Sequence, residues 1–144
     1  MEIRIRPYKP RDEEDLVQLW EDCGLVVPWN NPRKDIQRKL KVQSEMFLVG
    51  FLDGMLIASV MAGYEGHRGW INYLAVHPNY RRDGIGRQMM GAAEARLRAA
   101  GCPKINLQVR ANNQGVIEFY KRIGFKNDDV ISLGKRLDPD ELEA

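Results

Sequence analysis

The sequence predicts one α/β domain in which a mixed sheet carries helices on both faces. Its 144 residues suffice for a single domain with an apolar core. Strand-like and helix-like apolar periodicities follow in the order strand, helix, helix, three strands, helix, strand, helix, strand. A hairpin turn joins two early strands, whereas helical crossovers join the late ones. One sheet must therefore contain both antiparallel and parallel pairs.

Apolar periodicity and local start and stop signals delimit each element. Strands are expected over residues 3–6, 46–52, 55–62, 70–76, 104–109 and 130–137. Helices are expected over residues 12–23, 31–41, 86–100 and 113–123. Asp12 and Asn31 stand at helix starts as N-caps, and Asn112 or Asn113 does so for the last helix. The Asp-Gly pair between the second and third strands predicts a tight hairpin turn.

Charge, cysteine content and hydropathy narrow the class of protein. The net charge of +2 is too small to indicate a nucleic-acid or membrane partner by itself. Cys23 and Cys102 lack metal-ligand spacing, so no metal site is expected, and they favour a reducing compartment. No segment resembles a membrane span or a secretory leader, so a cytoplasmic location is expected. The acidic residues 138–144 are expected to form a loose tail beyond a domain of residues 1–137.

An arginine- and glycine-rich turn follows the strand at 70–76 and opens the next helix. It consists of Arg81, Arg82, Asp83, Gly84, Ile85, Gly86 and Arg87. The first turn of a helix leaves main-chain N–H groups unpaired beside a partial positive charge. Glycines let a phosphate approach that main chain, so the stretch predicts a pyrophosphate cradle. The alternatives are an ordinary turn and a dinucleotide site, which is disfavoured because Met89 stands where a third glycine belongs.

Two stretches of the chain resemble one known family. The run from Leu74 to Gly86 resembles the central motif, Q/R-x-x-G-x-G/A, of the GNAT superfamily of acetyl-CoA-dependent N-acetyltransferases. Residues 109–113 and 119–125 are similar to its second conserved block, and element order and spacing agree over residues 3–137. The resemblance implies a mixed sheet of about six to seven strands, splayed between the strands at 70–76 and 104–109. The gap between those strands would admit the cofactor.

The resemblance also implies roles for individual residues. The strand at Leu74 and Val76 would offer backbone groups to the pantetheine arm, and the turn would hold the pyrophosphate. Tyr120 would protonate the departing thiolate. The cofactor-binding set so implied is Leu74, Ala75, Val76, Arg81, Arg82, Asp83, Gly84, Ile85, Gly86, Arg87, Asn113, Val116 and Tyr120. The sequence departs from the usual family pattern at two places. Asp83 puts a negative charge in the anion-binding turn, so its side chain must point away from the anion. Gln114, Gly115 and Val116 stand where the family often has small alanines.

The implied chemistry suits these residue types. A lysine amine with a pKa of about 10.4 is less than roughly 0.1% neutral at pH 7, so the acceptor must lose a proton before it attacks. A phenol with a pKa of about 10 is protonated at pH 7 and can donate to a thiolate. A main-chain N–H near Leu74–Val76 would stabilise the thioester oxygen. We expect direct transfer in a ternary complex, because neither cysteine has a base in a recognisable motif.

The acceptor side carries weaker signals. Glu65, in the loop before the strand at 70–76, is the candidate general base, and Trp29, Asn30 and Asn72 are the candidate acceptor contacts. Each has a plain alternative: a surface loop residue, a packed tryptophan, a solvated strand residue. Likewise Tyr120 can be a core aromatic residue, and Asn113 can cap its helix. No motif in the sequence indicates which amine is the acceptor substrate.

Other classes of function remain open. A CoA-binding sensor or partner module without turnover would share the cofactor motifs. The basic helix at 31–41 allows a weaker hypothesis of nucleic-acid binding. The apolar residues Val26, Val27 and Trp29 are expected to form either a homodimer contact or an acceptor wall.

Overall fold

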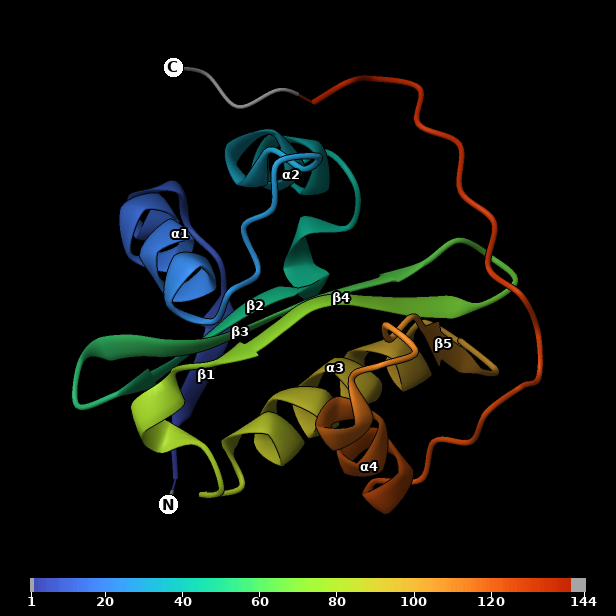
Figure 1. Ribbon diagram of the computed structural model, residues 1–144. Coiled ribbons are helices and arrows are strands. Elements are labelled where there is room, and N and C mark those ends of the chain that lie inside the picture. The colour runs from blue at the N-terminus through green and yellow to red at the C-terminus, as the bar shows by residue number, and fades with distance from the viewer. Residues whose placement is uncertain (1, 141–144) are drawn as a thin grey trace.

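A five-stranded sheet separates two helical layers in the computed structural model, which describes residues 2–140 (Figure 1). The strands are β1 (Arg4–Pro7), β2 (Phe47–Leu52), β3 (Met55–Tyr64), β4 (Gly69–Val76) and β5 (Ile105–Leu107), in that spatial order. The helices are α1 (Glu13–Asp22), α2 (Pro32–Lys39), α3 (Ile85–Ala99) and α4 (Gln114–Arg122). Helices α1 and α2 cover one face, whereas α3 and α4 cover the other (Figure 1). Short 3-10 turns occupy Pro10–Asp12, Ser44–Met46 and Pro78–Tyr80.

The strand pairing confirms the expected mixed sheet. Strands β1 to β4 pair antiparallel in sequence order. Strand β5 pairs parallel to β4 after the crossover through α3. No described helix is long and apolar enough to cross a membrane.

The expected strand at 130–137 is wrong, so the described sheet has five strands rather than six or seven. Residues 126–140, here called the C-terminal segment, run extended from α4 past β5 to α2 (Figure 1). The alternating apolar residues there do favour a strand. A strand nevertheless needs a ladder partner, and β5 offers only three residues.

Each face of the sheet has its own apolar core. Trp20, Leu16 and Leu19 of α1 are buried against one face, as their helical spacing predicts. On the other face, α3 buries its expected apolar residues, Met89, Met90, Ala93 and Leu97. The sheet thus holds both layers rigidly around β4, the strand next to the predicted cofactor site.

Two of the three helix N-caps predicted from the local sequence are confirmed. The side chain of Asn31 accepts hydrogen bonds from the main-chain N–H groups of Arg33 and Lys34, at 3.1 and 3.2 Å. Asn113 caps α4 through Val116 N–H at 3.3 Å. Asp12 stands at the N-cap position of α1, but its side chain makes no cap hydrogen bond. It binds the Arg6 guanidinium instead, at 2.8 and 2.9 Å, because a charged partner lies within reach from β1.

Strand β4 contains a β-bulge that the sequence does not reveal. Tyr73 has φ of +51°, and the register with β3 shifts between Ser59 and Met61. Met61 is paired with Asn72, so both side chains lie on the α1–α2 face of the sheet. Tyr73 packs on that face too, stacked on Trp20 with ring centroids 3.9 Å apart. The bulge therefore puts two consecutive β4 side chains on one face and re-aims the rest of the strand.

Candidate active site

The parallel pair β4–β5 opens into a wedge. Pairing covers only Gly69–Ile71 of β4 against Ile105–Leu107 of β5. Beyond Ile71, β4 remains paired with β3 through Asn72, Ala75 and Val76 but has no described strand on the β5 side. This confirms the expected splay. An extended molecule with amide groups fits such a wedge as an additional strand neighbour.

The glycine-rich turn ends beside the mouth of this wedge. Gly84 has φ of +77° and Arg82 has φ of +70°, so the main chain turns sharply before α3. The first main-chain N–H of this helix with a described partner belongs to Gln88, which donates to Gly84 O at 3.1 Å. Those of Ile85, Gly86 and Arg87 have no described acceptor. Three donors therefore stand free at the positive end of a 15-residue helix.

Side chains around the turn add positive charge. Arg81, Arg82 and Arg87 are all exposed, and Arg81 Nε donates to Val76 O at 3.3 Å. Asp83 is exposed too, and it makes no ion pair with a described residue. The turn therefore has the donors and the charge that an anion requires.

Gly86 lies against the Phe119 ring of α4, whereas its motif predicts a phosphate at this position. A Cβ at this position would lie 3.1 Å from Cζ and 3.3 Å from Cε1 of Phe119. The missing side chain thus lets α3 approach α4. Close packing between these helices accounts for the second glycine independently of any phosphate.

Tyr120 lies on α4, in the core cluster that also contains Leu74 and Val76. It is 9% exposed, and its ring packs edge-on against Phe119 and Phe125 at centroid distances of 5.1 and 5.4 Å. Its hydroxyl makes no hydrogen bond with a described residue, yet no described polar side-chain atom is both sealed from solvent and unpartnered. The hydroxyl therefore opens to solvent. Burial raises the pKa of Tyr120 to about 12, which keeps it protonated.

Glu65 and Asn72 lie together in a cleft of about 210 Å³ at the β3–β4 end of the sheet. Trp70, Tyr64 and Lys39 also line it. The Glu65 carboxylate accepts the main-chain N–H groups of His67, at 2.7 Å, and of Arg68. These bonds hold the pKa of Glu65 below its usual value, so it is a weak base in this arrangement.

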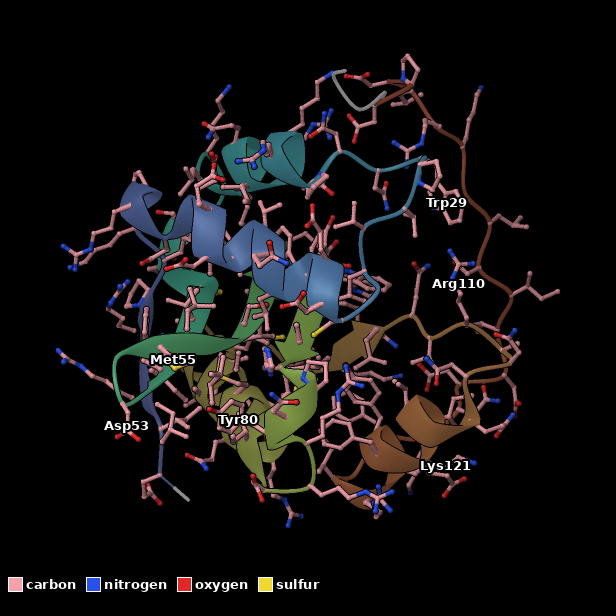
Figure 2. All side chains as sticks on the ribbon, turned by 60° about the vertical axis from the view of Figure 1, so that its left-hand side comes forward. Trp29, Asp53, Met55, Tyr80, Arg110 and Lys121 are labelled. Carbon is pink, nitrogen blue, oxygen red and sulfur yellow. The ribbon has the colours of Figure 1, made fainter. Side chains whose placement is uncertain are left out.

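Trp29 and Asn30 do not line that cleft. The Arg110 guanidinium lies over the Trp29 ring, 5.3 Å from its centroid (Figure 2). Asn30 Oδ1 accepts a hydrogen bond from Arg136 of the C-terminal segment at 2.6 Å. Trp29 is exposed, whereas Val26 and Val27 are half-buried. The expected acceptor contacts therefore fall in two places.

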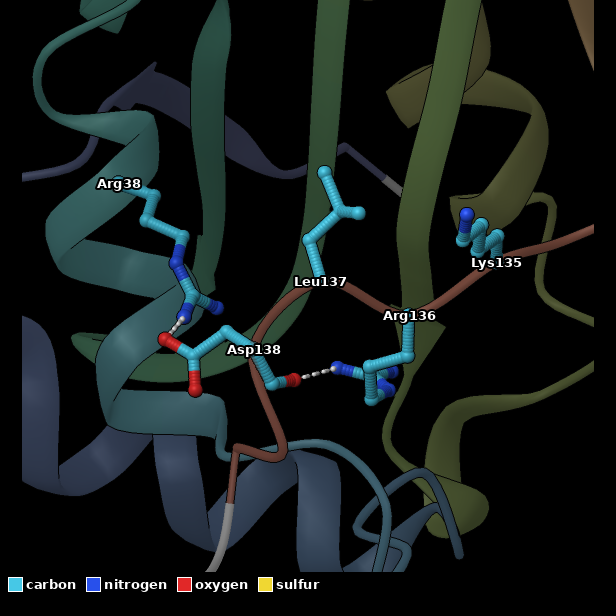
Figure 3. A pocket seen from close by; sticks show the side chains of 5 residues that line it. All are labelled: Arg38, Lys135, Arg136, Leu137 and Asp138. Atoms are coloured by element: carbon cyan, nitrogen blue, oxygen red, sulfur yellow. Dashed lines mark hydrogen bonds and ion pairs between the residues drawn. The ribbon is translucent and has the colours of Figure 1, made fainter.

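The C-terminal segment ends in an ion pair that the sequence did not suggest. Asp140 is only 1% exposed, and it accepts Arg38 at 2.6 Å and the main-chain N–H of Asn31 at 3.1 Å. The Arg38 guanidinium and the Asn31 N–H hold the pKa of Asp140 well below its usual range. Asp138 also meets Arg38, beside a cavity of about 430 Å³ (Figure 3). The expectation of a loose tail is thus wrong for residues 138–140, while residues 141–144 lie outside the described part.

Comparisons with known proteins agree on one family. The model of the acetyltransferase (GNAT) family matches residues 10–125. A Yersinia pestis protein named acetyltransferase is 46% identical over 141 residues, which cover 98% of this chain and 99% of that protein. The chain belongs to the GNAT family of acetyltransferases. It is an acyltransferase, and its acetyl donor is acetyl-CoA.

Solved GNAT structures share the fold at low identity. AAC(6')-Iy, in complex with a bisubstrate analogue of CoA, superimposes with a TM-score of 0.77 at 18% identity, covering 94% of this chain and 99% of that one. The PaiA N-acetyltransferase of Thermoplasma acidophilum, in complex with coenzyme A, gives 0.72 at 22% identity, covering 91% and 94%.

The residues of the turn and of the wedge fit the GNAT donor. Free N–H groups at the start of α3 suit its pyrophosphate, and the unpaired side of β4 suits the amides of its pantetheine arm. The sequence missed Tyr73, whose hydroxyl donates to Asp35 at 2.6 Å and ties β4 to α2. It missed Ser59 as well, which accepts from Trp20 Nε1 at 2.9 Å and donates to Tyr73 O at 2.8 Å. In the sequence, Tyr73 is one more residue of an apolar strand, so nothing there predicts the hydrogen bonds that link it to Asp35 and Ser59.

Proposed function

We propose that this acetyltransferase moves an acetyl group from acetyl-CoA to a primary amine of a small molecule or a protein. The observation that carries the proposal is the wedge beside β4, together with the groups near this strand: the turn with free N–H donors reaches Val76 at Gly86, and Tyr120 packs in the same apolar cluster as Leu74 and Val76. These parts suit the two ends of the donor, its pyrophosphate and its thioester.

The chain's own groups would act in one ternary complex. A main-chain N–H of Leu74–Val76 stabilises the charge that grows on the thioester oxygen as the amine nitrogen attacks the carbonyl carbon. A carbon–nitrogen bond forms, the carbon–sulfur bond breaks, and the Tyr120 hydroxyl gives its proton to the thiolate. Asn113 and Val116 hold the donor from α4, while water or a base takes the amine proton.

On the acceptor side we propose that Asn72 contacts the amine substrate through the cleft at the β3–β4 end. Trp29 and Asn30 would form a separate part of the acceptor side, where Asn30 accepts a hydrogen bond from Arg136 of the C-terminal segment and Trp29 packs against Arg110. The bonds within its loop support a role for Glu65 in fastening the loop over residues 63–69. Its assignment as general base stays a prediction.

The basic helix gives little support to the nucleic-acid hypothesis. Arg33 pairs with Glu13 and Glu14, and Arg38 pairs with Asp35 and two acidic residues of the C-terminal segment. Arg33 and Arg38 are therefore neutralised by neighbours and Lys39 donates to Ala62 O, which leaves Lys34 and Lys41 as the cations of residues 31–41 whose side chains have no described partner. For the cellular setting we propose the cytoplasm, which suits two free thiols.

The experiment is release of free CoA from acetyl-CoA in the presence of a panel of amines: polyamines, amino sugars, amino acids and peptides with free N-termini or lysines. Amine-dependent release at a rate above hydrolysis is expected for at least one class. Tight binding of acetyl-CoA by calorimetry without release for any amine would instead indicate a sensor module. Absence of acetyl-CoA binding would refute the proposal.

A further inference from the structure

The cleft at the β3–β4 end of the sheet contains a cation that no described carboxylate neutralises. The half-buried Lys39 ammonium lines this cleft and donates to the main-chain carbonyl of Ala62 at 2.5 Å. Within residues 2–140 it makes no ion pair. An ammonium group has three N–H donors, so two remain for another acceptor. Burial lowers the pKa of Lys39, and the nearby Glu45 charge does not fully compensate.

The cation lies against main chain that is fastened in place. A Cβ added to Gly63 would lie 3.3 Å from Lys39 Nζ and 3.4 Å from Gln43 Oε1, so the glycine leaves space for both groups. Gln43 accepts the main-chain N–H of Tyr64 at 2.7 Å and donates to its carbonyl at 3.1 Å. These contacts tie the chain after α2 to the end of β3, and they fix the position of the ammonium group.

Much of the remaining lining is apolar. Trp70 of β4 and Val42, which follows α2, are 39% and 58% exposed, and both line this cleft together with the buried Met61. A ligand with an apolar part would remove these two side chains from water. The volume of about 210 Å³ is below the roughly 300–1,000 Å³ of clefts that hold drug-sized ligands, which favours a small molecule.

The cleft extends along β4 toward the wedge. Asn72 lines it, and its side-chain amide makes no hydrogen bond with a described residue. Ala62, the acceptor of the ammonium group, pairs with Ile71, and Ile71 is three positions before Leu74. At about 3.3 Å per strand residue, the separation along the sheet is roughly 10 Å. One small amine can therefore place an anionic group at Lys39 and direct its nitrogen toward the thioester.

We propose that the acceptor of this acetyltransferase is a small amine that carries a carboxylate and an apolar side chain, as apolar amino acids do. Lys39 binds the carboxylate, Trp70 and Val42 cover the apolar part, and Asn72 contacts the amine end. The inference rests on the proposed acetyl transfer to an amine and names its substrate class. The products are the N-acetylated acid and free CoA.

Polyamines and amino sugars fit this cleft less well. Each of their additional ammonium groups would meet the like charge of Lys39. The other charged group of the lining, the Glu65 carboxylate, already accepts two main-chain N–H groups of its own loop. A carboxylate on the substrate is therefore the better complement to the charges present.

The test measures binding by calorimetry to the chain in complex with CoA, which has no acetyl group to transfer. The ligands are phenylalanine, leucine and methionine, each compared with its carboxamide and with its decarboxylated amine. Each amino acid is expected to bind at least about tenfold more tightly than its two analogues, because only it offers Lys39 a charged partner. The same order is expected for kcat/KM in the CoA-release assay. If CoA does not bind, which would refute the proposed function, the same titration of the free chain still tests the cleft.

Lys39→Gln removes the charge but keeps an N–H donor for the Ala62 carbonyl. It is expected to bring each amino acid within about twofold of its carboxamide, while the carboxamide itself binds within about twofold of its wild-type affinity. Lys39→Arg keeps the charge and should retain most of the preference. Lys41→Gln is the matched control, because Lys41 is exposed, lies two positions further along and does not line the cleft. It removes the same charge and should bind all ligands like wild type.

Carboxamides that bind as tightly as the amino acids, or a preference for the acids that Lys39→Gln leaves intact, would overturn the proposal. Tighter binding of a polyamine, or of a peptide whose carboxylate is many residues from its amine, would also overturn it by assigning the cleft to another acceptor. Amine-dependent CoA release without any preference for a carboxylate would support acetyl transfer and refute only the substrate class.

Discussion

Replacing Tyr120 by phenylalanine separates proton donation from packing. The ring contacts to Phe119 and Phe125 remain, and the hydroxyl has no described hydrogen bond to lose. The free energy of unfolding should therefore change by no more than about 0.5 kcal/mol at pH 7. If the hydroxyl protonates the thiolate, kcat should fall about a hundredfold, or about 2.7 kcal/mol in the barrier.

The assay follows free CoA with a thiol reagent at saturating acetyl-CoA, using the best acceptor of the panel. Acetyl-CoA affinity is measured separately by calorimetry and is expected to stay within about twofold, because a group needed only in the transition state contributes little to binding. Equal losses of kcat and of affinity would show that the hydroxyl binds the donor or supports the pocket. Unchanged kcat would refute its role as acid.

Stability at high pH provides a second readout of the same group. Its folded pKa of about 12 lies above its ordinary value of about 10, so above pH 10 the unfolded chain loses this proton before the folded chain does. Wild type should therefore lose stability between about pH 10 and pH 12, by up to about 3 kcal/mol from this group. Tyr120→Phe removes that loss, so the variant should become progressively more stable than wild type. A constant difference would contradict the burial of the phenol.

Three further predictions concern other positions. Asn31→Ala removes the cap of α2 and should lower the free energy of unfolding by about 1 kcal/mol in urea titrations, whereas Asn31→Ser should recover most of it. Gly86→Ala forces a Cβ against Phe119 and should cost about 1–3 kcal/mol, and a double change with Phe119→Leu should cost less than the sum of the single changes. Glu65→Gln should change kcat/KM less than about threefold if the residue only fastens its loop, whereas a loss of about a hundredfold would identify it as the base.

The elements that the sequence predicted correctly depend on nearby residues. The α2 cap, the Asp-Gly hairpin and the apolar faces of α1 and α3 all depend on residues within a few positions of one another. Asp12 failed as a side-chain cap because a residue on another element, Arg6, competes for its carboxylate. The strand at 130–137 failed for a related reason, since apolar alternation records a tendency to pair but not whether a neighbour exists.

In the candidate site, too, the features set by nearby residues were predicted correctly, whereas those set by distant contacts were not. The glycine-rich turn lies between β4 and α3 as its local sequence predicts, yet Gly86 meets Phe119, a residue 33 positions away, and this contact was invisible in the motif. The bulge at Tyr73 likewise depends on Ser59 and Trp20, which approach from β3 and α1. Local sequence therefore indicated where the turn forms, whereas distant packing decides how β4 is aimed.

Strand β4 is open on the side that faces the wedge. Strand β4 keeps β3 as its neighbour through Val76 but loses β5 after Ile71, so one side of residues 72–76 has no strand to complete the ladder. Burying such a side without hydrogen bonds would cost free energy for every unpaired group. An extended ligand with amides at strand-like spacing regains those bonds on binding, which favours the pantetheine arm over a compact ligand at this position.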